Sequence, residues 1–346
     1  MALNIRLVED SDSIDGFETS YCTLNFSGTS VNNVIVNTLR RVLMSLIPSY
    51  QFNPENIVIA KNTSIYDNDK MRCRLANFPI YIGKKIFKSM EVINDIDTLE
   101  FASELEYKAN LGSAEISIVE QKRFEREIDD NLVISINVVN TSDNDLSVMT
   151  DNPNVKFYYK KMEIPHIYDV PLLILKLRKD QEFVCNMTAD LDIGLFNGIY
   201  QPVSNCSIKE NGENDYDLYY SSKRQIGERD LLLRACHIIK NKIVLAGRVM
   251  AENIRAGGRE VIHEGEIDIE GEQHTMGNLL SHYMQMEADF CGYAVGHPNI
   301  NRCTFKYISK IPIDKVLGNA VKRIVEIFDE VEDKIKDMEF GYKYFN

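Results

Sequence analysis

The sequence has no pair of cysteines at a spacing suited to a metal ion. Its seven cysteines are scattered, and the closest pair, Cys291 and Cys303, is twelve positions apart. No CxxC motif occurs, so nothing indicates a structural zinc knuckle. An odd number of widely spaced cysteines is typical of reduced thiols in a cytosolic or nuclear protein. We therefore expect no metal ion and no cofactor.

Long hydrophobic runs are also absent. The first ten residues, "MALNIRLVED", lack the apolar core of a signal peptide. No apolar run approaches the ~20 residues that a membrane-spanning helix needs. We expect a soluble protein that is not secreted and does not contact a membrane.

Basic residues are fewer than acidic ones: the sequence has 39 Lys and Arg but 52 Asp and Glu, which gives a net charge of −13. A clamp on the nucleic-acid backbone needs a surplus of positive charge facing phosphate. A local basic patch is still compatible with this balance. We nevertheless expect no direct, sequence-specific contact with nucleic acid.

Motifs of the common enzyme classes are missing too. The sequence contains no GxGxxG, no GxxxxGK[ST] and no GxSxG. The acidic run "GEIDIEGE" at 265–272 alternates carboxylates with Ile267 and Ile269, which is typical of the solvated face of a strand. His274 and His282 are eight positions apart and could share a helix face, but no third ligand follows at a convincing spacing. We predict no catalytic residue.

The chain of 346 residues has 44% hydrophobic residues, enough for two or three globular domains. Its clearest element is a helix within residues 30–48, "SVNNVIVNTLRRVLMSLIP", which we expect Thr29 or Ser30 to cap and Pro48 to end. The apolar side chains repeat at helical spacing and form one stripe: Val31, Val34, Ile35, Leu39, Val42, Leu43 and Leu46. Arg40 and Arg41 are adjacent, so they cannot both point into this stripe.

Further elements follow along the chain. Residues 3–26 predict two short strands, residues 49–190 a β-rich region, and residues 206–222 a polar, acidic loop. A long amphipathic helix is predicted from about 226 to 254, and Gly257 and Gly258 then mark a flexible joint and a domain boundary. Beyond the joint we predict a strand at 264–272, a helix from His274 with Thr275 as its cap, a strand at 302–310 and a terminal helix from about 313 to 338.

The two halves of the chain echo each other weakly. "VNTLRRVLMS" at 36–45 aligns with "GNLLSHYMQM" at 277–286, which places Asn37 on Asn278, Leu39 on Leu280 and Val42 on Tyr283. Each half would have a helix with an apolar face that needs covering. The nearest candidate to cover it is the other half.

These segments resemble a known family. "NTLRRVLMSLIPSY" is similar to the alpha motif of the assembly subunits of multisubunit RNA polymerases, which are the bacterial alpha, the archaeal D and the eukaryotic third subunit. "RCRLANFPIYIG" at 72–83, "LLILKLRKDQEFVCNMTADLDIG" at 172–194 and "YQPVS" at 200–204 resemble later segments of the same subunits.

The second half is similar to the partner of that subunit, the archaeal L or eukaryotic eleventh subunit. Its residues match three short motifs of that partner: His274, Thr275, Gly277, Asn278, Leu279 and Leu280 in the first, Phe290, Gly292 and Tyr293 in the second, and His297 and Pro298 in the third. The resemblance covers nearly the whole chain and is weakest at 84–165. It implies a fusion of the two platform subunits, a layout known from large DNA viruses, and we infer a viral origin from that layout.

The resemblance implies an α+β fold in which two halves pair as an intramolecular pseudo-heterodimer. It places an alpha-like dimerisation domain at 1–48 and 191–256, an inserted β-rich domain at 49–190, a linker at 257–260 and an L-like dimerisation domain at 261–346. The expected pairing interface comprises the stripe above together with Leu279, Leu280, Tyr283, Ile324, Phe328 and Val331. Some relatives have zinc or iron–sulfur ligands in the inserted domain, but the matching stretch "KKIFKSMEVINDIDTLEFASEL" has no cysteine.

The implied function is a non-catalytic assembly platform of a DNA-directed RNA polymerase. The expected partners are the beta-like second-largest subunit, contacted by Arg40 and Arg41, and the beta′-like largest subunit. Small subunits resembling the tenth and twelfth are further candidates. A viral chain would work in cytoplasmic factories and enter the virion, with the nucleus open as an alternative. Two other functions stay open: a regulatory adaptor outside the polymerase core, and an unrecognised hydrolase or transferase.

Overall fold

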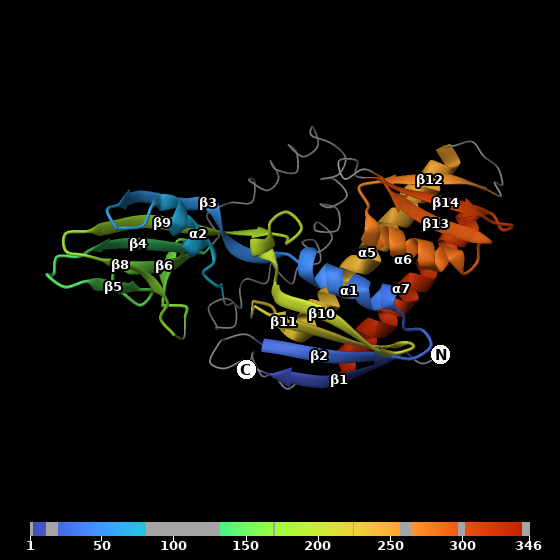
Figure 1. The fold of residues 1–346 in the computed structure, drawn as a ribbon, viewed down its shortest axis with the longest axis horizontal. Coiled ribbons are helices and arrows are strands. Elements are labelled where there is room, and N and C mark those ends of the chain that lie inside the picture. The colour runs from blue at the N-terminus through green and yellow to red at the C-terminus, as the bar shows by residue number, and fades with distance from the viewer. Residues whose placement is uncertain are drawn as a thin grey trace. The chain divides into compact units, whose positions relative to one another are not determined.

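The computed structural model describes residues 3–11, 20–80, 132–168, 170–223, 225–256, 264–296 and 302–340. The described residues form two compact units (Figure 1). One unit contains the described residues up to Ile47 and those from Pro202 onward, and the other contains those from Pro48 to Gln201. Both units mix strands and helices, so the α+β class predicted from the sequence is confirmed.

The first unit contains a four-stranded antiparallel sheet in the order β1-β2-β11-β10. Its strands are β1 (Asn4–Ser11), β2 (Ser20–Ser27), β10 (Val203–Gly212) and β11 (Asp215–Ser222). Cys22, Leu24 and Phe26 alternate into the core and are fully buried. This alternation confirms the strands predicted near the beginning of the chain.

The polar loop predicted at 206–222 is wrong, because these residues form the β10–β11 hairpin. Gly212 pairs with Asp215, so only two residues make the turn, and Asn214 adopts the positive φ that such a turn requires. Tyr216, Leu218 and Tyr220 alternate into the core. Charged side chains on the other face of the hairpin hide this alternation in the sequence.

The same unit holds a second antiparallel sheet, in the order β12-β14-β13. Its strands are β12 (Glu264–Glu270), β13 (Phe290–Val295) and β14 (Arg302–Ile308), of which β13 was not predicted. Ile267 and Ile269 are buried. The carboxylates that alternate with them face outward, where Glu266 pairs with Lys306 and Asp268 with Arg302. The prediction of a solvated acidic face is confirmed.

Four helices of this unit lie between and beside the two sheets (Figure 1). They are α1 (Asn33–Ser45), α5 (Glu228–Ala256), α6 (His274–Gln285) and α7 (Ile313–Asp337), close to the predicted bounds. α1 contacts β10 and β11, and α6 contacts β13 and β14. The long helices reach further: α5 contacts both β2 and β12, and α7 contacts β1.

The predicted caps of α1 and α6 are wrong. The cap of α1 is Asn32, whose Oδ1 accepts a hydrogen bond from the Ile35 amide at 3.0 Å. Gly28, at a φ of 119°, turns the chain before this cap, so the helix begins later than Thr29 or Ser30 would allow. The cap position of α6 is Gln273, which makes no side-chain capping bond, and Thr275 already lies inside the helix. α1 ends at Ser45, before Pro48.

The second unit is the β-rich region predicted from the sequence. Its larger sheet has the order β3-β9-β4-β6-β7, and a smaller sheet pairs β5 with β8. The strands are β3 (Ser49–Asn62), β4 (Val133–Val139), β5 (Leu146–Met149), β6 (Val155–Tyr159), β7 (Met162–Ile164), β8 (Leu173–Leu177) and β9 (Glu182–Asp192), joined by α2 (Asn68–Ala76) and a short 3₁₀ helix, η4 (Gly198–Tyr200). The segment without cysteines at 84–105 lies outside the described residues.

Among the described helices, none has a window apolar enough to cross a membrane.

Candidate helix-pairing interface

The apolar stripe of α1 points into the first unit. Of the seven residues predicted for it, Val34 is half-buried and the other six are at most 3% exposed. α1 contacts α5 and α6 on this side. α1 is therefore in contact with two helices that come much later in the chain.

The residues predicted for the second half are buried as well. Leu279, Leu280 and Tyr283 lie on the covered face of α6, and Ile324, Phe328 and Val331 lie on that of α7. α6 contacts α7, and α5 contacts α7. The structure thus places all thirteen predicted interface residues in one unit, where twelve are buried and Val34 is half-buried.

α1 and α6 run antiparallel, and polar contacts mark both ends of their contact. At one end, Asn32 Nδ2 donates to His282 Nε2 at 3.1 Å and to the Tyr283 hydroxyl at 3.5 Å. At the other end, Arg41 Nε donates to Thr275 Oγ1 at 2.5 Å. The start of each helix therefore lies beside the end of the other.

The two helices also bury the same positions. When they are aligned at their first residues, Asn33 and His274, each buried residue of α1 coincides with a buried residue of α6. This is the same register as the sequence echo. Asn32 then corresponds to Gln273, and Arg41 to His282. The two polar contacts at the helix ends therefore involve nearly corresponding positions of α1 and α6.

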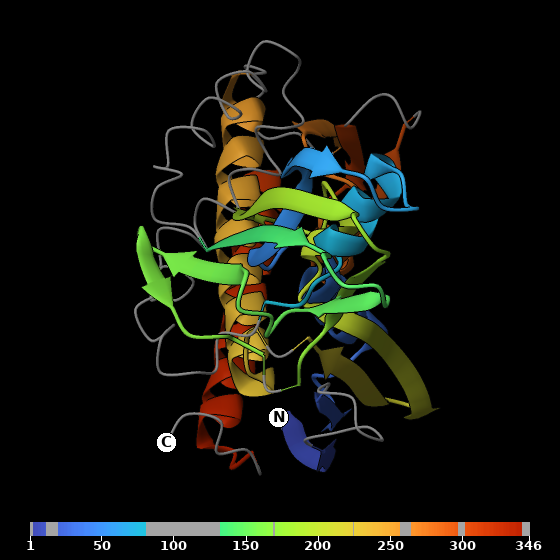
Figure 2. The ribbon, with the colours of Figure 1, turned by 90° about the vertical axis from the view of Figure 1, so that its left-hand side faces the viewer.

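α5 and α7 also pack antiparallel (Figure 2). Arg229 donates to the Lys336 carbonyl near one end. Further along, Lys240 Nζ contacts Asp329 Oδ1 at 2.7 Å and also Glu332. Burial alone would lower the pKa of Lys240, but the bonds that Lys240 donates to both carboxylates outweigh burial and raise this pKa above its usual value. These contacts fix the alignment of the two helices.

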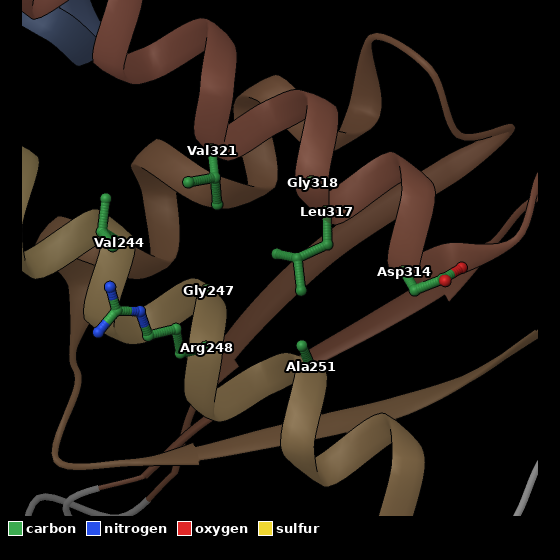
Figure 3. Close-up of a pocket in the computed structure, with 8 residues that line it drawn as sticks. All are labelled: Val244, Gly247, Arg248, Ala251, Asp314, Leu317, Gly318 and Val321. Carbon is green, nitrogen blue, oxygen red and sulfur yellow. The ribbon is translucent and has the colours of Figure 1, made fainter.

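A groove of about 250 Å³ lies between α5 and α7 (Figure 3). Gly247 allows α5 to come close, because a Cβ there would lie 2.8 Å from a Val321 methyl carbon. The lining is mainly aliphatic, with Arg248 on α5 and Asp314 on α7 as its charged members. It holds no cluster of nucleophilic or acid–base groups.

A buried ion pair joins α5 to the segment before α6. Lys242 Nζ lies 3.0 Å from Glu272 Oε1, and the two side chains are 1% and 5% exposed. Eleven residues further along α5, Asn253 Nδ2 donates to the Asp268 carbonyl of β12 at 2.7 Å. Both contacts join α5 to the segment that follows it in the chain.

Arg40 and Arg41 occupy different surroundings on α1. Arg40 is half-buried, donates from Nε to Asn37 Oδ1 at 3.0 Å and lies 3.6 Å from Met44 Sδ. Arg41 is exposed apart from its bond to Thr275. The pairing of Arg41 with Thr275 was not predicted.

The titratable groups at this interface have the pKa shifts of buried structural residues, which does not indicate a catalytic role. Burial lowers the pKa of His282, whose ring nitrogen faces the Asn32 amide, and raises the pKa of the Cys303 thiol to about 12. His274 contacts Tyr293 instead and so does not share a site with His282. Within the described residues, no group of three His, Cys, Asp or Glu side chains could hold a metal ion.

Sequence reasoning missed the polar contacts of the interface. Asn32, Lys240, Lys242 and Glu272 were not singled out, although Lys242 carries a signal of its own. It stands between Ile239 and Ala246 on the apolar stripe of α5, where a charge is out of place unless it is paired.

Comparisons with known proteins agree with this geometry. Residues 264–334 match the RNA polymerase Rpb3/Rpb11 dimerisation domain. The chain is 22% identical over 330 residues to a putative DNA-directed RNA polymerase subunit of Acanthamoeba polyphaga mimivirus, covering 90% of this chain and 89% of that protein.

Two cellular relatives match shorter parts. The probable RPAC2 subunit of RNA polymerases I and III of Caenorhabditis elegans is 33% identical over 70 residues, which are 19% of this chain and 49% of that protein. The mouse RPAC1 subunit of RNA polymerases I and III is 26% identical over 113 residues, 32% of each chain.

Proposed function

We infer the function of this chain from its relatives and its helix packing: it contains an RNA polymerase Rpb3/Rpb11 dimerisation domain and is a non-catalytic, alpha-like subunit of a DNA-directed RNA polymerase. It is related to a viral polymerase subunit over nearly its whole length. Neither the adaptor function nor the hydrolase or transferase function is favoured by these relatives.

We propose further that the chain is a fused pseudo-heterodimer. Its first half would comprise residues 1–48 and 191–256, interrupted by an inserted β-rich domain at 49–190, and its second half would comprise 261–346 after a linker at 257–260. The packing of α1 and α5 against α6 and α7 is the single observation that supports this most strongly. Because the compact β-rich unit extends to Gln201, we move the second boundary of the insertion toward that residue.

The paired helices would organise the polymerase in a simple way. Holding both halves on one chain gives them a high effective concentration for each other. The paired unit would then present one rigid surface to the beta-like and beta′-like subunits, with Arg41 exposed for a carboxylate or carbonyl of the beta-like subunit. Small subunits resembling the tenth and twelfth would complete the assembly, in viral factories in the cytoplasm and in the virion.

Affinity purification of the tagged full-length chain from cells that produce its polymerase tests the proposal. We expect both large subunits to co-purify in near-equal amounts, identified by mass spectrometry. The purified chain alone should turn over no nucleotide. Recovery without large subunits, or with only traces of them, would contradict the assembly function and favour an adaptor.

A further inference from the structure

We propose that the groove between α5 and α7 is the docking site for an amphipathic helix of another polymerase subunit. The docked helix has aliphatic side chains along its contact face, a carboxylate on the flank beside Arg248 and a basic side chain on the flank beside Asp314. The inference rests on the proposed function, because it takes the partner to be a subunit of the same polymerase. It adds a second docking surface to the one proposed at Arg41.

Both walls of the groove have the spacing of a helix face. The lining positions are 244, 247, 248 and 251 on α5 and 314, 317, 318 and 321 on α7, so each wall follows the pattern i, i+3, i+4, i+7. Figure 3 shows the two sets of residues on neighbouring stretches of the helices. A trough between two helices that is about two turns long has the shape to receive the side-chain ridge of a third helix.

The aliphatic lining of the groove still has surface to be covered. Leu317 is 2% exposed, whereas the other aliphatic lining residues are only half-buried: Val244, Ala251 and Val321. Aliphatic side chains of a docked helix would remove this surface from water, and the groove volume of about 250 Å³ gives room for them. Burial of aliphatic surface therefore supplies the affinity.

The two glycines of the groove differ in what requires them. Gly247 is required by the fold of this chain, because a Cβ there would lie 2.8 Å from a Val321 methyl carbon. Gly318 is exposed inside the 25-residue helix α7, and a Cβ built there would meet no described atom within 4 Å. Since glycine lowers helix stability relative to alanine, the described contacts do not explain this residue. A docked helix explains it, because the missing side chain lets its backbone come close to α7.

Two charges of opposite sign lie on opposite walls of the groove. Arg248 on α5 and Asp314 on α7 are both exposed, and neither forms an ion pair with another residue that the structure describes. They attract a carboxylate to one flank of the docked helix and a basic side chain to the other. A helix docked in the opposite direction would bring like charges together, so these contacts determine orientation and specificity more than affinity.

A second copy of this chain fits the groove less well. Two copies that faced each other through the same groove would bring hollow against hollow, with no ridge to fill the space. A helix of a different subunit supplies such a ridge. Self-association is therefore the alternative that the experiment must separate from docking of a partner subunit.

Photo-crosslinking in the assembled polymerase tests the proposal. The tagged full-length chain, with the photoreactive residue p-benzoylphenylalanine in place of Val244, is expressed in cells that produce the polymerase, irradiated and purified. We expect mass spectrometry to find position 244 linked to another subunit, in a segment with aliphatic residues one turn apart and opposite charges on its two flanks. The same photoreactive residue in place of Glu326, an exposed residue of α7 outside the groove, should give no link to that segment.

Charge exchange in the crosslinking chain then tests the polar contacts. Arg248→Glu combined with Asp314→Lys should lower the yield of the link at least about tenfold, because both flanks of the docked helix now meet like charges. Exchanging the two flank charges of the mapped segment should restore the yield. Gly318→Gln should also lower it, since the longer side chain fills the space over α7, while the melting temperature of the free chain stays nearly unchanged. Glu326→Lys is the matched control and should change neither.

The proposal is overturned if position 244 links to no other subunit, if it links to a second copy of this chain, or if the linked segment lacks the stated charges. It is also overturned if charge exchange or Gly318→Gln leaves the yield unchanged. These outcomes are separable from a failure of the proposed function. If only the docking proposal fails, the unmodified chain still recovers both large subunits; if the proposed function fails, it recovers neither.

Discussion

Helices α1 and α6 bury corresponding positions, but they differ in how they are capped and in how one of these positions is packed. α1 is capped by the side chain of Asn32, whereas Gln273 makes no such bond before α6. Val36 fills a buried position of α1, and its equivalent on α6 is Gly277. A Cβ at Gly277 would lie 2.6 Å from the Tyr293 ring and 2.8 Å from Cys303 Sγ.

The difference shows how two helices with the same pattern of burial pack against their sheets in different ways. On α1, the side chain of Val36 fills the buried position. On α6, the backbone at Gly277 comes so close to Tyr293 and Cys303 that there is no room for one more carbon. The two helices share the pattern of burial but not the packing around it.

The largest effect on stability should come from a charge placed at one of the buried positions that α1 and α6 share. Leu39 is fully buried on α1, as is its equivalent Leu280 on α6. Either Leu39→Asp or Leu280→Asp should cost more than about 4 kcal/mol of stability, because an unpaired carboxylate would be buried. Circular dichroism and light scattering should show unfolding or aggregation in both variants.

Asn33→Asp is the control for this pair, since it adds the same charge at an exposed position at the start of α1 and should be nearly neutral. A soluble, well-folded Leu39→Asp protein would refute the assignment of α1 to the interface. Unequal responses of Leu39 and Leu280 would refute the equivalence of the two helices.

Adding a single methyl group should have opposite effects on stability at two glycines. Gly277→Ala should destabilise the protein by about 1–3 kcal/mol, since the added carbon overlaps Tyr293 and Cys303. Gly318→Ala on α7 meets nothing within 4 Å and should instead stabilise by about 0.5–1 kcal/mol through helix propensity. Denaturant unfolding of both variants tests the expected opposite signs, and equal signs would contradict the close approach of α6.

A pH-dependent effect should appear at the Asn32 end of the α1–α6 contact. Asn32 Oδ1 is occupied by the Ile35 amide, so its Nδ2 must donate to His282 Nε2, which has to be unprotonated. Because burial lowers the pKa of His282 in the folded state, the unfolded chain binds the proton first as pH falls below about 6.5. Stability should therefore be complete above pH 6.5 and decrease below it, until the lowered folded pKa is reached.

Unfolding curves between pH 7.5 and 5 measure this loss. His282→Gln can still accept from Asn32 without titrating, so it should remove the His282 share of the pH dependence. The ion pair of Glu332 does not interfere. Burial would raise the pKa of Glu332, but bonds from Lys240 and Lys336 outweigh it and lower the pKa, so this contribution is lost only below the range tested. An unchanged pH profile in His282→Gln would contradict the assignment.

The smallest effect on stability should come from Arg41→Ala. Arg41 is exposed and makes one hydrogen bond to Thr275, so the cost should be below about 1 kcal/mol. Binding of the beta-like subunit should fall clearly in a co-purification assay. Lys322→Ala, which removes an exposed charge from α7, should change neither. A large drop in the melting temperature of Arg41→Ala would instead make Arg41 a structural residue.

The helices could be predicted from the sequence because their apolar residues recur at helical spacing over three or more turns. The hairpin of β10 and β11 could not, since charged residues such as Lys209 and Glu210 dominate its exposed face. β13 was missed because Phe290 and Ala294 are exposed and break the alternation of an ordinary half-buried strand.

The polar side of the interface was the least predictable part. Asn32 and His282 are far apart in sequence, and only the antiparallel packing of α1 and α6 brings them together. Lys242 and Glu272 meet because α5 extends past its own sheet to β12, an arrangement that no local pattern encodes. Local periodicity indicates which faces are buried, but it does not indicate which charges meet across them.

The contact between α1 and α6 lies within a single polypeptide, and this has a consequence for the relative amounts in which the two helices are made. Two separate subunits would dissociate on dilution, and an excess of one would remain uncovered. Helices encoded in one reading frame are always synthesised in equal numbers, and their association does not weaken when copies are few. The first molecules translated can therefore begin assembly without waiting for a second gene product to accumulate.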